Sequence, residues 1–308
     1  MLMRHAGLDI SDDYIRCLTY SGNFPDLKIH SSATMAVPVG VIEGGDVKDP
    51  KVFEELLTTF NKEQGLSYVK VSIPEEKAYL FQTDVAGSDP RSIAQNIEFK
   101  LEENVPLAAG DAVFYFDILP VSVTGGTLRA SVSVVPREYV EMIVASLRRA
   151  GMAPVAFEVV PKAIARAVVP VEDESTTMLV HIMNNKTGVY IVSAGVVCFT
   201  STVSWGGRNS TGKETENAEV LIKEIERFND YWSSHGLDTA EIKKIILLGN
   251  EAPVFENKIK NAFVRSGINI SVAEVWKNAF SLDRYIPSIS RADSLDYAVT
   301  AGLARDLN

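Results

Sequence analysis

Runs of residues typical of β-strands alternate along this chain with runs typical of α-helices, which restricts the fold to the α/β or mixed α+β class. The first unit opens with strand-like residues 7–20 and continues in extended form to Val41. A helix is predicted from about Pro50 to Gly65, because apolar residues repeat there at helical spacing, proline suits a first turn and glycine suits an end. The chain therefore begins with a β-rich segment followed by a helix.

The second unit, from about Thr83 to Phe157, has the pattern of a separate small module. Its predicted order is helix, strand, strand, helix, and its landmarks are the helix start at Asp89 and Pro90, strands 112–119 and 128–135 joined through Gly125 and Gly126, and a helix from Pro136 to Gly151. Proline at a helix start and glycine at a helix end have the expected asymmetry. We expect an α+β module here.

The third unit follows a charged linker at residues 172–175. It predicts strands 178–182, 189–193 and 196–203, a helix from about Asn217 to His235, and a strand at 244–248. A last helix is predicted over residues 294–307.

Two segments of the chain are weakly alike. Residues 8–20 (LDISDDYIRCLTY) and 180–192 (VHIMNNKTGVYIV) each have a strand, a polar turn and a second strand. Aligned, they place Asp9 with His181 and Ile10 with Ile182. The likeness suggests a duplicated core.

Composition excludes several functional classes. At about 150 residues per domain, 308 residues suggest two domains, and 46% hydrophobic residues exclude long disorder. A net charge of −10, without a basic run, argues against a nucleic-acid partner. Cys17 and Cys198 lie in apolar runs and suit reduced core residues in a reducing compartment. With no apolar stretch of about 18 residues and no secretory signal, we expect a cytoplasmic chain.

One string resembles a phosphate-binding loop. Residues 207–215 (GRNSTGKET) fit the P-loop pattern up to Lys213, but Glu214 follows where a hydroxyl is needed to ligate Mg²⁺. A polar connecting loop is the favoured interpretation, with a P-loop nucleotide switch as the alternative. The four histidines lack the spacing of zinc ligands, and no nucleophile motif is present, so no catalytic or metal residue is predicted.

Six blocks together resemble the PilM family of type IV pilus assembly proteins. They are GLDISDDYIR (7–16), GVIEGGDVKDPKVFEELL (40–57), IEFKLEENVPLAAGDAVFYFDIL (97–119), VVPREYVEMIVASLRRAGMAPVAFEV (134–159), VSWGG (203–207) and DYAVTAGLARDL (296–307). PilM and its relative FtsA belong to the actin/Hsp70-like ATPase superfamily. The resemblance implies an actin-like, ribonuclease H-like duplicated two-lobe α/β fold with an inserted α+β subdomain 1C.

The resemblance also implies domain boundaries. Subdomain 1A would comprise 1–82 and 158–175, subdomain 1C would be inserted at 83–157, and subdomain 2A, with a much reduced 2B, would span 176–288. A C-terminal helix in 289–308 would return to 1A.

Family members hold ATP through two phosphate hairpins and a glycine-rich adenosine loop, and each of these motifs is altered here. In the first hairpin Asp9 is retained, but Ser11 is followed by two aspartates, with Arg16 at the usual lysine position. The second hairpin has His181 in place of its aspartate, although Lys186 could still touch a phosphate. Carboxylates beside a polyanion are unfavourable.

The adenosine loop keeps Gly249 but continues with Asn250 and Glu251, and few residues separate Gly207 from the next helix, so the lid over the adenine is predicted to be missing. We therefore expect a degenerate scaffold without cofactor or hydrolysis. The alternative is an active ATPase that binds ATP and Mg²⁺; its ligand residues would be Asp9, Ser11, Arg16, Lys186, Gly206, Gly207, Gly249 and Asn250.

The resemblance implies a protein partner. PilM-type proteins bind the short cytoplasmic N-terminal tail of a PilN-like inner-membrane protein between subdomains 1A and 1C, so membrane association would come only through that partner. The channel is predicted near Phe99, Leu101, Val105 and Phe116. A related adaptor, the cytoplasmic part of a GspL-like type II secretion protein, shares this fold, but the lack of a C-terminal span favours the pilus protein. Homo-oligomers or filaments are also compatible with the fold.

Overall fold

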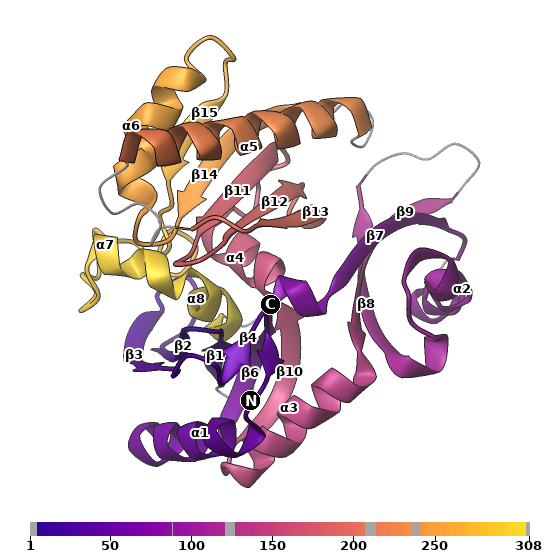
Figure 1. Cartoon of the computed structure of the whole chain (residues 1–308), viewed down its shortest axis with the longest axis vertical. Coiled ribbons are helices and arrows are strands. Elements are labelled where there is room, and N and C mark those ends of the chain that lie inside the picture. The colour runs from indigo at the N-terminus through magenta and orange to yellow at the C-terminus, as the bar shows by residue number, and fades with distance from the viewer. Residues whose placement is uncertain (1–4, 88, 121–126, 207–213, 236–240, 306–308) are drawn as a thin grey trace.

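Two five-stranded mixed sheets form the two lobes of the molecule (Figure 1). The structure is a computed structural model and describes residues 5–87, 89–120, 127–206, 214–235 and 241–305. The first sheet has the order β10-β6-β1-β2-β3, with β1 Ala6–Ile10, β2 Tyr14–Ser21, β3 Lys28–Ala36, β6 Tyr68–Ile73 and β10 Ala153–Val159. The second has the order β13-β12-β11-β14-β15, with β11 Thr176–Ile182, β12 Thr187–Ser193, β13 Val196–Val203, β14 Ile242–Leu248 and β15 Asn269–Val272.

The two sheets share one topology, which confirms the predicted duplication. In each, a hairpin (β1–β2 or β11–β12) is extended antiparallel by the next strand and flanked in parallel by a later one. Asp9 pairs with Arg16 one position before the turn, and His181 pairs with Gly188 at the equivalent position. The predicted alignment of Asp9 with His181 is therefore correct.

Helices α4 (Val160–Val168) and α8 (Ala298–Ala304) pack between the lobes, as Figure 1 shows. Their close approach depends on glycine. A Cβ atom on Gly302 would lie 1.8 Å from the Ala163 carbonyl oxygen, and one on Gly7 would lie 2.3 Å from that of Thr300. These small residues let α8 seat directly on α4 and β1.

The outer faces of the sheets are covered by other helices. Helices α1 (Pro50–Gln64) and α3 (Arg137–Arg149) bury the apolar face of the first sheet, and α5 (Glu214–His235) and α6 (Ala252–Ala262) bury that of the second. Helix α1 has the predicted ends, because Asp49 accepts a hydrogen bond from the backbone N–H of Val52 and Gly65 adopts the left-handed conformation.

The inserted module is smaller than the predicted 83–157. It consists of β7 (Tyr79–Val85), α2 (Pro90–Asn104), β8 (Ala112–Leu119) and β9 (Leu128–Pro136), in a sheet of order β7-β9-β8 with its own core. The remaining elements belong to the first lobe, because β10 pairs with β6 and α3 packs against α1. The module with its own core thus ends before α3, whose apolar face is buried on the first sheet.

Some predicted features differ or lie outside the described residues. The last helix is divided into α7 (Arg291–Ser294), a 3-10 turn and α8. The P-loop-like string, including Gly207 and Lys213, and the Gly125–Gly126 turn fall in ranges that the structure does not describe. A short hairpin, β4 (Ile42–Glu43) and β5 (Asp46–Val47), precedes α1. Among the described helices, none has the length and apolarity to cross a membrane.

Candidate functional site

A cleft opens between the lobes where the β1–β2 turn faces the β11–β12 turn. Its volume is about 190 Å³, below the roughly 300–1,000 Å³ usual for small-molecule sites. Four of the residues predicted to bind nucleotide line this cleft: Ser11, Arg16, Lys186 and Asn250. The contacts of these residues determine what the cleft can hold.

Asp9 is buried and directed at its own sheet. It accepts a hydrogen bond of 2.6 Å from Ser72 Oγ. Burial raises the pKa of its carboxyl, and the Ser72 hydroxyl and the Arg16 charge only partly offset this. A buried, hydrogen-bonded carboxyl of this kind stabilises the sheet and is poorly placed to order water around a metal ion.

The other turn residues are also occupied. The carboxylate of Asp12 accepts hydrogen bonds of 2.9 Å from the backbone N–H groups of both Gly44 and Gly45. Ser11 closes its own turn, with its hydroxyl 3.2 Å from both the nitrogen and the oxygen of the Tyr14 backbone. These side chains hold the turn instead of presenting backbone N–H groups to a phosphate.

Arg16 is fully engaged within the first lobe and its C-terminal segment. Its Nε donates to Thr34 Oγ1 at 3.0 Å, its Nη1 donates to the Asp296 backbone oxygen, and its Nη2 lies 3.4 Å from Asp296 Oδ2. The guanidinium also lies over the ring of Tyr14, 3.9 Å from its centroid. The side chain is 6% exposed, so little of its charge faces the cleft.

Polar contacts around the cleft cross from one lobe to the other. Asn184 Nδ2 donates to Asp13 Oδ2 at 2.7 Å. Lys186 Nζ forms an ion pair with Glu76, and Asn250 Nδ2 donates to Asp296 Oδ2. Two residues predicted as nucleotide ligands, Lys186 and Asn250, thus bind carboxylates of the opposite lobe.

The two described glycines of the nucleotide motifs have structural roles. A Cβ atom on Gly206 would lie 2.4 Å from the Met183 carbonyl oxygen, and one on Gly249 would lie 1.9 Å from that of Ile182. Gly249 also has a φ of 92°, which side chains disfavour. Both glycines allow neighbouring segments to pack against the β11–β12 turn.

The electrostatics of the cleft oppose a polyanion. His181 is buried, Nδ1 lacks a hydrogen-bond partner among the described residues, and burial, Lys186 and Arg16 lower its pKa to about 3, which keeps it neutral. The charged residues that line the cleft are four acids and two paired cations: Asp12, Asp13, Glu251, Asp296, Arg16 and Lys186. Within the described residues no group of three potential metal ligands occurs. These residues do not fit Mg²⁺-ATP.

A second concavity lies between the inserted module and the first sheet. This groove, with a volume of about 390 Å³, runs between two strands that each have one free edge, β8 and β10. Its walls are mostly apolar, and the apolar lining residues are Ile73, Val113, Phe114, Tyr115, Val135, Val140, Ala156, Phe157 and Val159. The Tyr115 side chain is 58% exposed, and Lys162 Nζ lies over its ring, 3.8 Å from the centroid.

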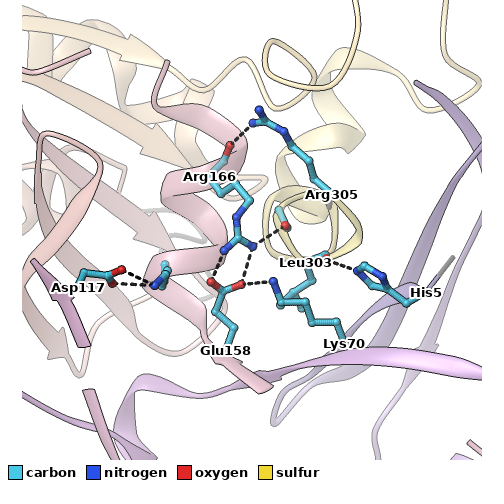
Figure 2. Close-up of polar contacts among 9 residues, drawn as sticks. His5, Lys70, Asp117, Glu158, Arg166, Leu303 and Arg305 are labelled. Atoms are coloured by element: carbon cyan, nitrogen blue, oxygen red, sulfur yellow. Dashed lines mark hydrogen bonds and ion pairs between the residues drawn. The ribbon is translucent and has the colours of Figure 1, made fainter. Parts of the chain in front are cut away.

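Three charged residues, Lys70, Glu158 and Lys162, line the groove, and Figure 2 shows the contacts of Lys70 and Glu158. Glu158 lies between two cations: Lys70 Nζ is 2.9 Å from its carboxylate, and Arg166 binds the same carboxylate through two nitrogens. Burial raises the pKa of Glu158, but Arg166 and Lys70 outweigh it and hold that pKa below 4.5. Lys162 Nζ donates to Asp117 at 2.7 Å and 2.9 Å.

The four residues predicted to line a partner channel do not line this groove. Leu101 and Val105 are buried in the core of the module, and Phe116 packs against that core. Phe99 is 86% exposed on the outer face of α2. On β8, Val113, Tyr115 and Asp117 alternate with the side chains that face the core of the module.

That alternation was the available signal for the groove. A strand in which a tyrosine and a valine alternate with core residues has two apolar faces, one of which needs a cover. The Lys70–Glu158–Arg166 network had no sequence signal, since its members come from β6, β10 and α4.

The comparisons with known proteins are consistent with this geometry. The family model for Type IV pilus assembly protein PilM matches residues 7–217. A solved PilM-PilN type IV pilus biogenesis complex is similar over 98% of both chains, with a TM-score of 0.80 and 18% identity. The cytoplasmic domain of EpsL, an inner membrane component of the type II secretion system of Vibrio cholerae, has a TM-score of 0.53 and 13% identity, over 99% of this chain and 96% of that chain.

A third similar structure is the ethanolamine utilization protein EutJ from Carboxydothermus hydrogenoformans, with a TM-score of 0.52 and 12% identity over 97% of this chain and 88% of that chain. No curated protein matches the chain in sequence. At these identities the solved structures show a shared actin-like fold, as the sequence predicted.

Proposed function

Because this chain belongs to the PilM family of type IV pilus assembly proteins, we propose that it is a binding protein of a pilus inner-membrane platform, acting through its groove and without hydrolysing nucleotide. The observation that carries this proposal is the contrast between its two concavities. The groove is open, mostly apolar and bordered by free strand edges, whereas the cleft is small, acidic and crossed by contacts between the lobes.

The proposed occupant of the groove is the N-terminal tail of a PilN-like inner-membrane protein. The similar solved structure is a complex of a PilM with PilN, which supports a partner of this kind. An extended tail suits the groove because β8 and β10 each present one unpaired edge, and a strand edge supplies backbone hydrogen bonds while apolar pockets select side chains. The protein would then be cytoplasmic and held at the membrane through this tail.

The affinity should come mainly from apolar burial around Tyr115. A short peptide in such a groove is expected to bind with a Kd near 1 μM, about −8 kcal/mol. The charged residues that line the groove are internally paired, so they would orient the tail by hydrogen bonds more than by net charge.

Titration calorimetry with a synthetic peptide of the N-terminal tail of a PilN-like protein tests the proposal. We expect one-to-one binding that Tyr115→Asp weakens at least about thirtyfold, the loss typical of an interface hot spot. Phe99→Ser is the matched control, since Phe99 is an exposed aromatic residue of the same module that faces away from the groove. Equal binding by wild type and Tyr115→Asp would exclude the groove.

Two alternatives are separated by simple measurements. An active ATPase would bind Mg²⁺-ATP in the cleft and hydrolyse it. A P-loop nucleotide switch would bind nucleotide through Lys213, and the single substitution Lys213→Ala would abolish that binding.

A further inference from the structure

We propose that the second lobe positions one wall of the groove. Three residues of the inserted module contact the second lobe and act as positioning residues for the tail: Gln82, Leu119 and Ser131. None of them is among the described residues that line the groove. This inference rests on the proposed function and deepens it, because it states what holds the tail site in shape.

The inserted module contacts the second lobe at β13. Ser131 Oγ donates to the Val197 carbonyl oxygen at 2.6 Å, and Gln82 Nε2 donates to that of Cys198 at 2.9 Å. Leu119 is 2% exposed and packs in the apolar core of the second lobe. Figure 1 shows β13 beside β7. The module, which the chain connects to the first lobe, is therefore also held by the second.

A β-bulge lies in β13 at this contact. The ladder pairs Ile191 with Phe199 and Val192 with Val197, so Cys198 is an extra residue without a partner in β12. In a regular strand successive carbonyl groups point to opposite edges, whereas here those of Val197 and Cys198 both accept hydrogen bonds from the module. A bulge changes the direction of a strand locally, so this edge strand presents two acceptors to the module.

The groove wall and the contact with β13 belong to one face of the module's sheet. Gln82, Ser131 and Asp117 lie side by side on β7, β9 and β8. Two residues farther along, Tyr115 pairs with Ser133, and both line the groove. Alternate residues of a strand point to the same face, and two residues span about 7 Å. A change in how the module sits on β13 therefore moves the groove wall.

The other end of the module is held by the first lobe. Arg137, the first residue of α3, donates hydrogen bonds of 2.9 Å and 3.0 Å to the carbonyl oxygens of Gly110 and Ala112. Lys162 of α4 adds an ion pair with Asp117, and these two side chains are 20% and 30% exposed. If the contact with β13 is lost, these attachments remain and the module can tilt about them. The groove would then change its width without losing any of its lining residues.

Titration calorimetry of the full chain with a synthetic peptide of the N-terminal tail of a PilN-like protein tests this inference. The double variant Gln82→Ala/Ser131→Ala removes both hydrogen bonds to β13 and leaves every groove residue in place. Its Kd should rise at least about tenfold, because the tail must order the loosened wall as it binds. Gln95→Ala, at an exposed glutamine on α2 of the same module, is the matched control and should bind as the wild type does.

Spin labels give a readout that a general loss of stability would not produce. Labels at Phe99→Cys on the module and Val39→Cys on the first lobe replace side chains that are 86% and 97% exposed, whereas the native Cys17 and Cys198 are buried. The distance distribution between the labels, measured by pulsed EPR, should be narrow in the wild-type background and broader in the double variant. Saturating peptide should narrow it again. Circular dichroism checks that each variant is folded.

The outcomes separate this inference from the proposed function. An unchanged affinity or an unchanged distance distribution in the double variant would overturn the inference. A wild-type chain that does not bind the peptide would contradict the proposed function instead, and a broader distribution in the double variant would still show that β13 positions the wall.

Discussion

Replacing Glu158 by glutamine should be among the most destabilising single changes in the first lobe. Its carboxylate is 7% exposed and is shared by Lys70 and Arg166, which are 11% and 9% exposed. At the 2.9 Å separation from Lys70, the gross attraction is about 6 kcal/mol at an effective dielectric constant of 20. Glu158→Gln keeps the shape but leaves two buried cations without a counter-charge.

The expected loss is about 3–5 kcal/mol of unfolding free energy, the range for breaking a buried pair. For a chain of this size, at about 2 °C per kcal/mol, the thermal midpoint should fall by roughly 6–10 °C. Lys70→Met should cost less, because Arg166 still neutralises Glu158. Lys260→Ala, which removes an exposed helix pair with Glu256, is the control and should cost under about 0.5 kcal/mol.

Urea unfolding followed by circular dichroism measures these differences in unfolding free energy. The dependence of the unfolding free energy on acidic pH provides a second test. The folded-state pKa of Glu158 is depressed, so its stabilisation is present above the unfolded value near 4.5 and is lost as pH falls through the lower folded value. The wild-type and Glu158→Gln stabilities should therefore converge as the pH falls from 4.5 through the lower folded pKa. A loss under about 1 kcal/mol at pH 7 would refute the view that this network holds β6, β10 and α4 together.

Three further outcomes are expected. Gly249→Ala should cost at least about 2 kcal/mol in urea unfolding, because its Cβ would lie 1.9 Å from the Ile182 oxygen, whereas Gly195→Ala, with open space around it, should cost about 1 kcal/mol; equal costs would contradict the packing argument. His181 has a folded pKa of about 3, so between about pH 3 and 6.5 it binds a proton only in the unfolded chain. The unfolding free energy of the wild type relative to that of His181→Gln should therefore fall by about 2 kcal/mol from pH 7.5 to 5. Parallel curves of unfolding free energy against pH would show that it titrates normally. A double-mutant cycle of Asp13→Ala and Asn184→Ala should give a coupling of about 0.5–1.5 kcal/mol, and additive effects would mean that the lobes do not depend on this contact.

Local sequence signals predicted most of the elements correctly. Asp49 and Asp89 each precede a proline and accept hydrogen bonds from backbone N–H groups, so the starts of α1 and α2 were readable. The matching hairpins at residues 8–20 and 180–192 showed the duplication. The resemblance supplied the fold class, which the shared topology of the two sheets confirms.

Contacts between segments that are distant in the sequence could not be predicted from it. Helix α3 was assigned to the inserted module because it follows β9, but its apolar face is buried on the first sheet. Leu101 and Val105 were predicted to line a partner channel, but they lie in the core of the inserted module. An apolar pattern in the sequence does not indicate which neighbouring element the residues pack against. The groove instead uses the opposite face of β8, where Tyr115 lies.

In the nucleotide motifs, the sequence showed which residues are changed but not which partners the remaining residues contact. The changes at residues 11–13, 181 and 250–251 were visible in the sequence. The partners that now occupy Lys186 and Asn250 were not visible, because Glu76 and Asp296 come from distant segments. Side chains of the two lobes contact one another around the cleft where the family resemblance predicts a nucleotide.

We propose that this protein acts through its groove while its cleft is closed to nucleotide. Calorimetric titration of the wild-type chain with Mg²⁺-ATP tests it most directly. We predict no saturable heat. Saturable binding with a Kd below about 100 μM, near −5.5 kcal/mol, that is lost in Lys186→Ala would contradict the claim.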